Sequence, residues 1–320
     1  MKRIIIILIV TICQFTTYAQ ARKFLRQATK TNDLNEKIEL YTQVIELEPK
    51  NLDAYFYRGL AKNDLGDYSG AIVDYSKIIV IQPDADTYYN RGNSRYSIKN
   101  YVGAKDDYEN AYKLDPNFID ALYSLACVKY DLGDFEGAIS NLSGVINVDP
   151  SVTKTYYLRA SAYAALENHK LALNDYSLAI LSDQSSDSFY NRGVFYLSIN
   201  YYQDANTDFS IAIKRNRNNS FAHFYRGTSF LLLGKYEDAL LDFNTALGFD
   251  PLDFDALTGL ALTYYNMNNL NSAKLHFQKA KAIIAPEATI DSIDQFKNTY
   301  WYQNQYFYFS ENFKKLVNLQ

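Results

Sequence analysis

The chain has 320 residues, of which 48% are hydrophobic and 21% are charged, and its formal net charge is −4. This mild acidity excludes a typical nucleic-acid-binding surface, which needs clustered Lys and Arg. Two cysteines, Cys13 and Cys127, exclude a disulfide-rich scaffold, so the stability of the fold must come from packing.

The N-terminus has the pattern of a secretory signal peptide. Lys2 and Arg3 precede a short apolar run, and small residues follow at Ala19 and Ala21. We therefore expect a signal peptide over residues 1–19, with cleavage after Ala19 or after Ala21. The mature protein would then be periplasmic, associated with the cell envelope or secreted.

Two alternatives to cleavage remain open. A retained N-terminal anchor is one, although the apolar run is shorter than the ~20 residues that span a bilayer comfortably. A lipid anchor on Cys13 fits less well, because Ile12 is bulky where such signals carry a small residue. No later segment is long and apolar enough to cross a membrane, so we expect no transmembrane segment in the mature chain.

Beyond the N-terminus, three residue types recur with gaps of 33 or 34 residues. An alanine stands at Ala71, Ala104, Ala138, Ala172, Ala205, Ala239 and Ala273. Twelve positions earlier comes a small residue, at Gly59, Gly92, Ala126, Ala160, Gly193, Gly227 and Ala261. Four positions later comes a large apolar residue, at Tyr75, Tyr108, Leu142, Tyr176, Phe209, Phe243 and Phe277. Self-similarity at this period predicts stacked supersecondary units.

The repeat over residues 220–253 shows the predicted local structure. Ser220 can cap a first helix that Gly234 ends, and a second helix runs from Tyr236 to the residues before Pro251. Apolar residues in both halves fall three and four positions apart, which is helical periodicity. Each repeat is therefore predicted to be a pair of helices that cross closely at the small residues.

This pattern resembles the tetratricopeptide repeat, an antiparallel helix pair of ~34 residues whose copies stack. The small residue, the alanine and the large apolar residue carry the resemblance, together with the closing prolines Pro83, Pro116, Pro150 and Pro251. The resemblance implies an all-α fold, a right-handed superhelical solenoid of stacked helix pairs. Seven repeats fill residues 52–285: 52–84, 85–118, 119–152, 153–185, 186–219, 220–253 and 254–285. A degenerate first repeat over 20–51 precedes them.

An Arg and an Asp vary together among these repeats. Five repeats carry an Arg just before the small residue and an Asp sixteen positions later: Arg58 and Asp74, Arg91 and Asp107, Arg159 and Asp175, Arg192 and Asp208, Arg226 and Asp242. The two repeats without the Arg also lack the Asp: Leu125 and Asn141, Leu260 and His276. We predict partly buried structural bridges, because the planar guanidinium can grip a carboxylate through two hydrogen bonds. A catalytic or ligand-binding role for these charges is the alternative.

The resemblance also implies a concave groove lined by the first helices, with the fifth position of each repeat facing it. That position is aromatic in six repeats: Phe56, Tyr89, Tyr123, Tyr157, Tyr190 and Phe224. The second position is acidic in five: Asp53, Asp86, Asp120, Asp187 and Asp255. We hypothesise that this surface binds an apolar and basic peptide rather than an acidic one. Packing of the aromatics on neighbouring repeats, and the preference of Asp for the first turn of a helix, are the competing explanations.

After Pro286 the repeat pattern stops. Residues 289–303 and 305–319 are predicted to be helices, with Tyr302, Tyr306, Phe309 and Phe313 on one face. Repeat arrays need a terminal element that covers their last apolar face. We therefore expect residues 286–320 to form C-terminal capping helices, and an aromatic dock for a partner protein is the alternative.

The sequence offers no set of catalytic residues. The three histidines have no metal-ligand spacing, and no Gly-rich phosphate loop, nucleophile elbow or Cys/His cluster is present. We therefore expect no enzymatic activity, no cofactor and no metal site, and predict a scaffold that binds protein or peptide segments in its groove. The alternatives are a secreted carbohydrate-binding array, since sugars stack on tyrosine rings, and an accessory subunit of an envelope enzyme or secretion complex.

Overall fold

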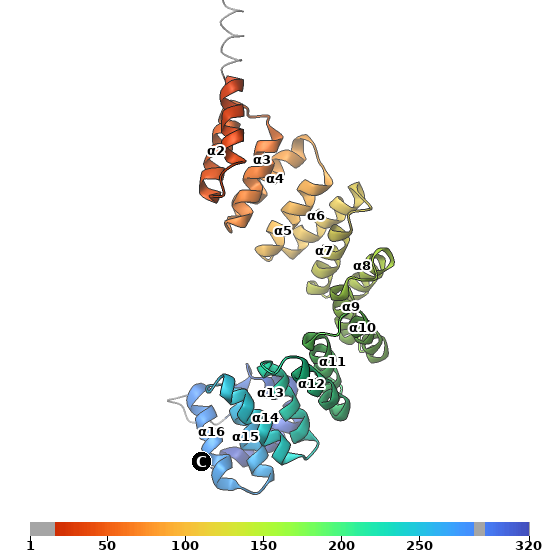
Figure 1. The fold of residues 1–320 in the computed structure, drawn as a ribbon, viewed down its shortest axis with the longest axis vertical. Helices are drawn as coiled ribbons and strands as arrows, with labels where there is room; N and C mark the ends of the chain where they lie inside the picture. Colours follow the sequence, from red (N-terminus) through yellow and green to blue (C-terminus); the bar gives the residue numbers. More distant parts are fainter. Residues whose placement is uncertain (1–16, 285–291, 320) are drawn as a thin grey trace, which may run out of the picture. The chain divides into compact units, whose positions relative to one another are not determined.

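The computed structural model describes residues 17–284 and 292–319. Most of the predicted signal peptide, residues 286–291 of the predicted cap and residue 320 therefore lie outside the described residues. Within those ranges all regular secondary structure is helical. The chain divides into an N-terminal body, which ends at Glu167, and a C-terminal body, which begins at Asn168 (Figure 1). Each body is described by itself.

The N-terminal body is a succession of helices joined by short turns. Residues 17–28 are helical and precede α2 (Leu34–Leu47), α3 (Leu52–Asp64), α4 (Tyr68–Ile81), α5 (Ala85–Ser97), α6 (Tyr101–Leu114), α7 (Ile119–Asp131), α8 (Phe135–Val148) and α9 (Thr153–Ala165). Within this body each helix from α2 to α9 packs on the next one along the chain.

The C-terminal body continues the same pattern and then departs from it. Its repeat helices are α10 (His169–Ser182), α11 (Ser186–Ser198), α12 (Tyr202–Arg215), α13 (Ser220–Leu232), α14 (Tyr236–Phe249), α15 (Phe254–Asn266) and α16 (Leu270–Ile284). The terminal segment holds η1 (Ile293–Phe296), α17 (Tyr300–Asn304) and α18 (Tyr306–Val317). The predicted all-α array of stacked antiparallel helix pairs is confirmed.

The turn inside each repeat has one left-handed residue. These residues are Gly66, Lys99, Gly133, Glu167, Asn200, Gly234 and Asn268, with φ between 57° and 88°. After α13, the Lys235 amide donates to the Phe230 carbonyl oxygen at 2.9 Å, the bond that closes a Schellman turn. At the other end of α13, Asn219 rather than Ser220 is the N-cap, because its side chain accepts from the Ala222 amide.

The regularly spaced small residues mark where the two helices of a repeat cross. All seven spaced alanines are fully buried. A Cβ added to Gly59 would lie 2.7 Å from Cε1 of Tyr75, so the aromatic ring of α4 occupies the space that a side chain on α3 would need. The period in the sequence therefore reflects close approach of helices, repeated once per unit.

The predicted helix over 289–303 is wrong, because the described part of this stretch holds two short helical turns instead. The Ser292 side chain accepts from the Asp294 amide and starts η1, and the Thr299 side chain accepts from the Tyr302 amide and starts α17. Local side-chain caps of this kind compete with a continuous helix. The second predicted helix, 305–319, corresponds to α18.

The terminal segment packs on the last repeat. Phe296 stacks on Phe277 of α16 with ring centroids 6.2 Å apart, and Phe313 meets the same ring edge-on at 6.5 Å. Phe296 and Phe309 are fully buried. These contacts cover apolar surface that a following repeat would otherwise cover. None of the described helices combines the length and the apolarity that crossing a membrane requires.

Candidate functional site

The aromatic residues at the fifth position belong partly to the core. Four of them pair with the large apolar residue on the second helix of their own repeat, with centroid distances of 5.9 Å for Phe56–Tyr75, 5.8 Å for Tyr89–Tyr108, 6.2 Å for Tyr190–Phe209 and 5.9 Å for Phe224–Phe243. Phe224 is buried, and the other five predicted aromatics are half-buried. The four paired rings therefore stabilise the crossing of the two helices of their repeat. Only part of each half-buried ring remains accessible.

The acidic residues at the second position lie in the first turn of their helices. Asp53, Asp86, Asp120 and Asp187 are all exposed. A carboxylate near a helix N-terminus is stabilised by the helix dipole, so a ligand is not needed to explain them. Their exposure leaves them able to bind one.

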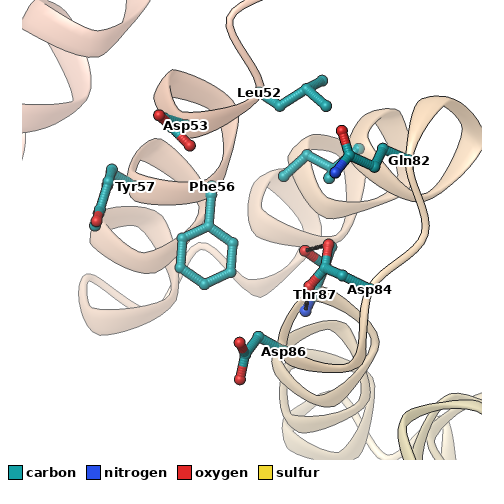
Figure 2. A pocket seen from close by; sticks show the side chains of 9 residues that line it. Leu52, Asp53, Phe56, Tyr57, Gln82, Asp84, Asp86 and Thr87 are labelled. Carbon is teal, nitrogen blue, oxygen red and sulfur yellow. Dashed lines mark hydrogen bonds between the residues drawn. The ribbon is translucent and has the colours of Figure 1, made fainter. Parts of the chain in front are cut away.

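One pocket in the N-terminal body joins the two residue classes. It lies between α3 and α5 and is lined by Leu52, Asp53, Phe56, Tyr57, Ile78, Gln82, Asp84, Asp86 and Thr87 (Figure 2). Its volume is about 320 Å³. Asp84 is engaged as the cap of α5, because its carboxylate accepts from the Thr87 amide at 2.8 Å and from the Thr87 hydroxyl at 2.7 Å. Asp53 and Asp86 are the exposed carboxylates of this pocket.

Other residues of the chain cover part of the remaining fifth-position rings. Tyr89 has the Phe118 ring 4.8 Å away, and the Lys154 ammonium lies 4.2 Å above the Tyr123 ring. Tyr157 is half-buried on α9.

A second pocket, of about 390 Å³ in the C-terminal body, is lined by Asp187, Tyr190, Asn191, Asn216, Asn218, Asn219, Ser220 and Phe221.

The surface around Phe224 is already filled by the terminal segment. The Tyr300 ring meets the Phe224 and Tyr225 rings edge-on, each at 5.1 Å, and Trp301 lies 6.2 Å from Phe224. The Tyr300 amide donates to both carboxylate oxygens of Asp255, at 3.0 and 3.2 Å. The chain thus places one of its own aromatic residues against a fifth-position ring and a second-position carboxylate.

This contact changes the ionisation of Asp255. Burial raises its pKa to about 6 although the amide hydrogen bond from Tyr300 opposes the rise, and the neighbouring Asp253 carboxylate contributes in the same direction as burial. Trp301 adds a hydrogen bond from its indole nitrogen to the Asp255 carbonyl oxygen at 2.8 Å. The repeat pattern predicts Asp255 as a second-position carboxylate. It does not predict the hydrogen bonds from Tyr300 and Trp301, because the pattern ends before the terminal segment begins.

A four-residue motif around Phe224 occurs a second time in the sequence, around Phe56. Residues 56–59 and 224–227 both read Phe-Tyr-Arg-Gly, and an Asp stands at the second position of the following repeat in both cases, Asp86 and Asp255. The motif and the Asp of the following repeat thus put two aromatic residues and a carboxylate at the same repeat positions in both bodies.

Four of the five predicted Arg–Asp pairs form two-point bridges. The two nitrogen–oxygen distances are 2.9 and 2.6 Å for Arg58–Asp74, 3.0 and 2.7 Å for Arg91–Asp107, 2.7 and 2.9 Å for Arg192–Asp208, and 2.7 and 2.8 Å for Arg226–Asp242. The four aspartates are buried. Arg159 and Asp175 belong to different bodies, so their pairing stays a prediction.

Each Arg also reaches a hydroxyl that the Arg–Asp spacing does not indicate. The third nitrogen of the five guanidinium groups donates to the preceding repeat, at Thr42, Ser76, Ser143, Ser177 and Ser210. Leu125 and Leu260 stand in place of the Arg in two repeats, and the repeats before these two carry Glu109 and Asn244 at the hydroxyl position. In the four repeats with a two-point bridge the Arg therefore ties three helices together, and the hydroxyl varies with the Arg and the Asp as one set.

The described residues show no arrangement suited to metal binding. No group of three His, Cys, Asp or Glu side chains gathers among them as metal ligands would. His169, His223 and His276 each contact a ring, a carboxylate or a backbone oxygen of their own body. Burial raises the pKa of the half-buried Cys127 thiol, which disfavours its reactive thiolate form.

Comparison with known proteins agrees with this architecture. Human tetratricopeptide repeat protein 6 is 25% identical over 234 residues, which make up 73% of this chain and 39% of that protein. Human tetratricopeptide repeat protein 13 is 28% identical over 116 residues, or 35% of this chain and 14% of that protein. The chain thus spans less than half the length of these relatives.

Two solved structures share the fold. One is a tetratricopeptide repeat protein from Parabacteroides merdae, with 16% identity, a TM-score of 0.58 and coverage of 84% of this chain and 98% of that chain. The other is the C-terminal part of a TPR repeat-containing protein from Cytophaga hutchinsonii, with 17% identity, a TM-score of 0.62 and coverage of 75% and 98%.

Family profiles described as tetratricopeptide repeat match most of the described chain. The matched residues are 18–86, 85–118, 123–188, 190–254 and 254–285. These matches include the region of the degenerate first repeat and all seven regular repeats. The chain belongs to the tetratricopeptide repeat family.

Proposed function

We propose that this protein is a non-enzymatic scaffold that binds segments of other proteins on the face formed by the second and fifth positions of its repeats, here called the groove face. The open pocket between α3 and α5 carries this proposal. It joins an aromatic ring, Phe56, with two exposed carboxylates, Asp53 and Asp86, and its volume of about 320 Å³ suits one large side chain of a partner.

The charge of this pocket indicates the kind of segment that it would bind. Two carboxylates beside an aromatic ring attract a basic or neutral segment and repel an acidic one. In the terminal segment Phe296, Trp301 and Phe309 are fully buried and serve the packing of the cap, whereas Phe307 of α18 is exposed. The groove face is the surface to test first, because its pocket joins an aromatic ring with two exposed carboxylates.

The test is capture of protein partners from an extract of the source organism's cell envelope. Asp53→Lys combined with Asp86→Lys reverses two exposed charges without touching the core, and should lose partners that the unchanged protein retains. Asp106→Lys combined with Glu109→Lys makes the same change of charge at exposed positions of α6 and should retain them. If both variants retain the same partners, binding at the pocket between α3 and α5, which carries the proposal, is ruled out. Retention of sugars on a glycan array without any protein partner would favour the carbohydrate-binding alternative.

We also propose that the protein is exported after cleavage of its N-terminal signal. Ala21 is fully buried against the first helices, next to the side chains of α2, so cleavage after Ala19 would leave this packing residue in place. Mass spectrometry of the protein from its native source gives the mature N-terminus directly. A chain that retains Met1 would contradict cleavage.

A further inference from the structure

The filled surface of the C-terminal body shows how this fold holds an aromatic residue. Phe224 and Tyr225 provide two ring contacts around Tyr300, and Asp255 of the next repeat accepts the backbone amide of the same residue. Ring contacts of this geometry favour an aromatic side chain, and the carboxylate selects a segment with a free amide at that point. We call Phe224, Tyr225 and Asp255 together the filled subsite.

The N-terminal body has the same three residues at the same repeat positions. Phe56, Tyr57 and Asp86 correspond to Phe224, Tyr225 and Asp255, and they line the pocket between α3 and α5 (Figure 2). The caps also correspond: Asp84 accepts the Thr87 amide at 2.8 Å, and Asp253 accepts the Ala256 amide at 3.0 Å. The backbone at the start of the two acidic helices is therefore fixed in the same way. We call the three pocket residues the open subsite.

The other repeat boundaries do not carry this combination. The corresponding triplets are Tyr89, Asn90 and Asp120; Tyr123, Ser124 and Lys154; Tyr157, Leu158 and Asp187; and Tyr190, Asn191 and Phe221. Phe118 covers the ring in the first of these triplets, and Lys154 covers the ring in the second. The coincidence of residue types is therefore specific to the open and the filled subsites and is not a general property of the repeat.

Resting on the scaffold function proposed above, we infer that the open subsite binds an aromatic residue of a partner protein in the way that the filled subsite binds Tyr300. The ring of that residue lies against Phe56 and Tyr57, and its backbone amide donates to the Asp86 carboxylate. The partner segment is neutral or basic, because Asp53 and Asp86 both line the pocket. Its aromatic residue begins a helical turn and follows a Ser or Thr cap, as Tyr300 follows Thr299.

The probe for this inference is a synthetic peptide with the sequence of residues 297–304, acetylated, amidated and fluorescently labelled. Fluorescence anisotropy with the full chain measures its affinity. We expect saturable binding, and an about tenfold loss of affinity on Asp86→Ala, since a charge-assisted hydrogen bond is removed. Asp106→Ala removes an exposed carboxylate from α6, outside the groove face, and should leave the affinity unchanged.

Two changed peptides test the proposed contacts directly. Methylation of the backbone nitrogen at the position of Tyr300 removes the amide donor and keeps the ring, and replacement of that tyrosine by alanine keeps the donor and removes the ring. Both should bind about tenfold more weakly than the probe. Equal binding of all three peptides would overturn the inference, as would binding that Asp255→Ala abolishes and Asp86→Ala does not.

This experiment separates the inference from the scaffold function. The peptide could fail to bind while the double variant Asp53→Lys and Asp86→Lys still loses its native partners. The aromatic ligand would then be wrong, and the scaffold function would stand. If the peptide fails to bind and the double variant also keeps its partners, both proposals are wrong. The melting curve of each variant, followed by circular dichroism of the whole chain, checks that the body carrying the substitution is folded.

Discussion

The open and the filled subsites have the same three residue types at the same repeat positions and different surroundings. Phe224 is only 6% exposed and Asp255 is largely desolvated, because Tyr300 and Trp301 lie on them. Phe56 is half-buried, and Asp86 is exposed. The same three residue types are thus covered by a segment outside the repeats in one body and left accessible in the other. Four substitutions test this interpretation, and the one with the greatest expected effect comes first.

Trp301→Ala should release the filled subsite from the terminal segment. Trp301 is fully buried, and truncation of a buried aromatic of this size costs about 3–5 kcal/mol. Phe307→Ala, at a ring that is 85% exposed, is the control and should change stability by less than about 0.5 kcal/mol. Urea unfolding followed by circular dichroism measures both, and equal midpoints would contradict burial of Trp301. If the terminal segment detaches in the Trp301 variant, the probe peptide should find two sites per chain instead of one.

Arg192→Leu tests whether the Arg–Asp bridges stabilise the helix pairs of the repeats without taking part in the subsites. The change leaves the buried Asp208 carboxylate without its guanidinium partner, which costs about 3–5 kcal/mol for a well-buried pair. Adding Asp208→Asn, which copies the natural pairing of Leu125 with Asn141, should restore part of the loss. Thermal melting measures the three proteins. A double variant no more stable than the single one would refute the structural role, and peptide affinity at the open subsite should stay the same throughout.

Asp255→Asn tests the desolvation of the filled subsite through the pH dependence of stability. The folded-state pKa of Asp255 is raised to about 6 from an ordinary value of 3.8. The folded protein therefore binds a proton more tightly than the unfolded chain, and this contribution to stability is complete below about pH 4 and lost as the pH rises through about 6. The Asn side chain resembles the protonated form and still accepts the Tyr300 amide. The variant should melt higher than the unchanged protein at pH 7, and the difference should disappear near pH 4.

Asp183→Asn is the opposite control for this titration. The Ser185 hydroxyl and amide lower the pKa of the exposed Asp183 carboxylate, so its small contribution is present at neutral pH and lost in acid. The Asn variant should be slightly less stable than the unchanged protein at pH 7. Parallel pH profiles of the two variants would show that the buried contact to Tyr300 has no part in the behaviour of Asp255.

Much of the architecture follows from residue spacing alone. The regularly placed alanines predict the period, and the glycines Gly66, Gly133 and Gly234 indicate the left-handed turn that joins the two helices of a repeat. The sixteen-residue spacing of Arg58 and Asp74 predicts a contact that the helices then form. Such features depend on neighbours within about one repeat, so local spacing determines them.

Residue spacing therefore accounts for the helix pairs, their stacking and the Arg–Asp bridges. The place of the irregular terminal segment depends on tertiary contacts, because Ser292 and Thr299 interrupt its helix and free Tyr300 and Trp301 to reach α13 and α15. That contact joins residues far apart in the chain and has no period to reveal it. It also decides which of two equivalent subsites is filled and which stays open.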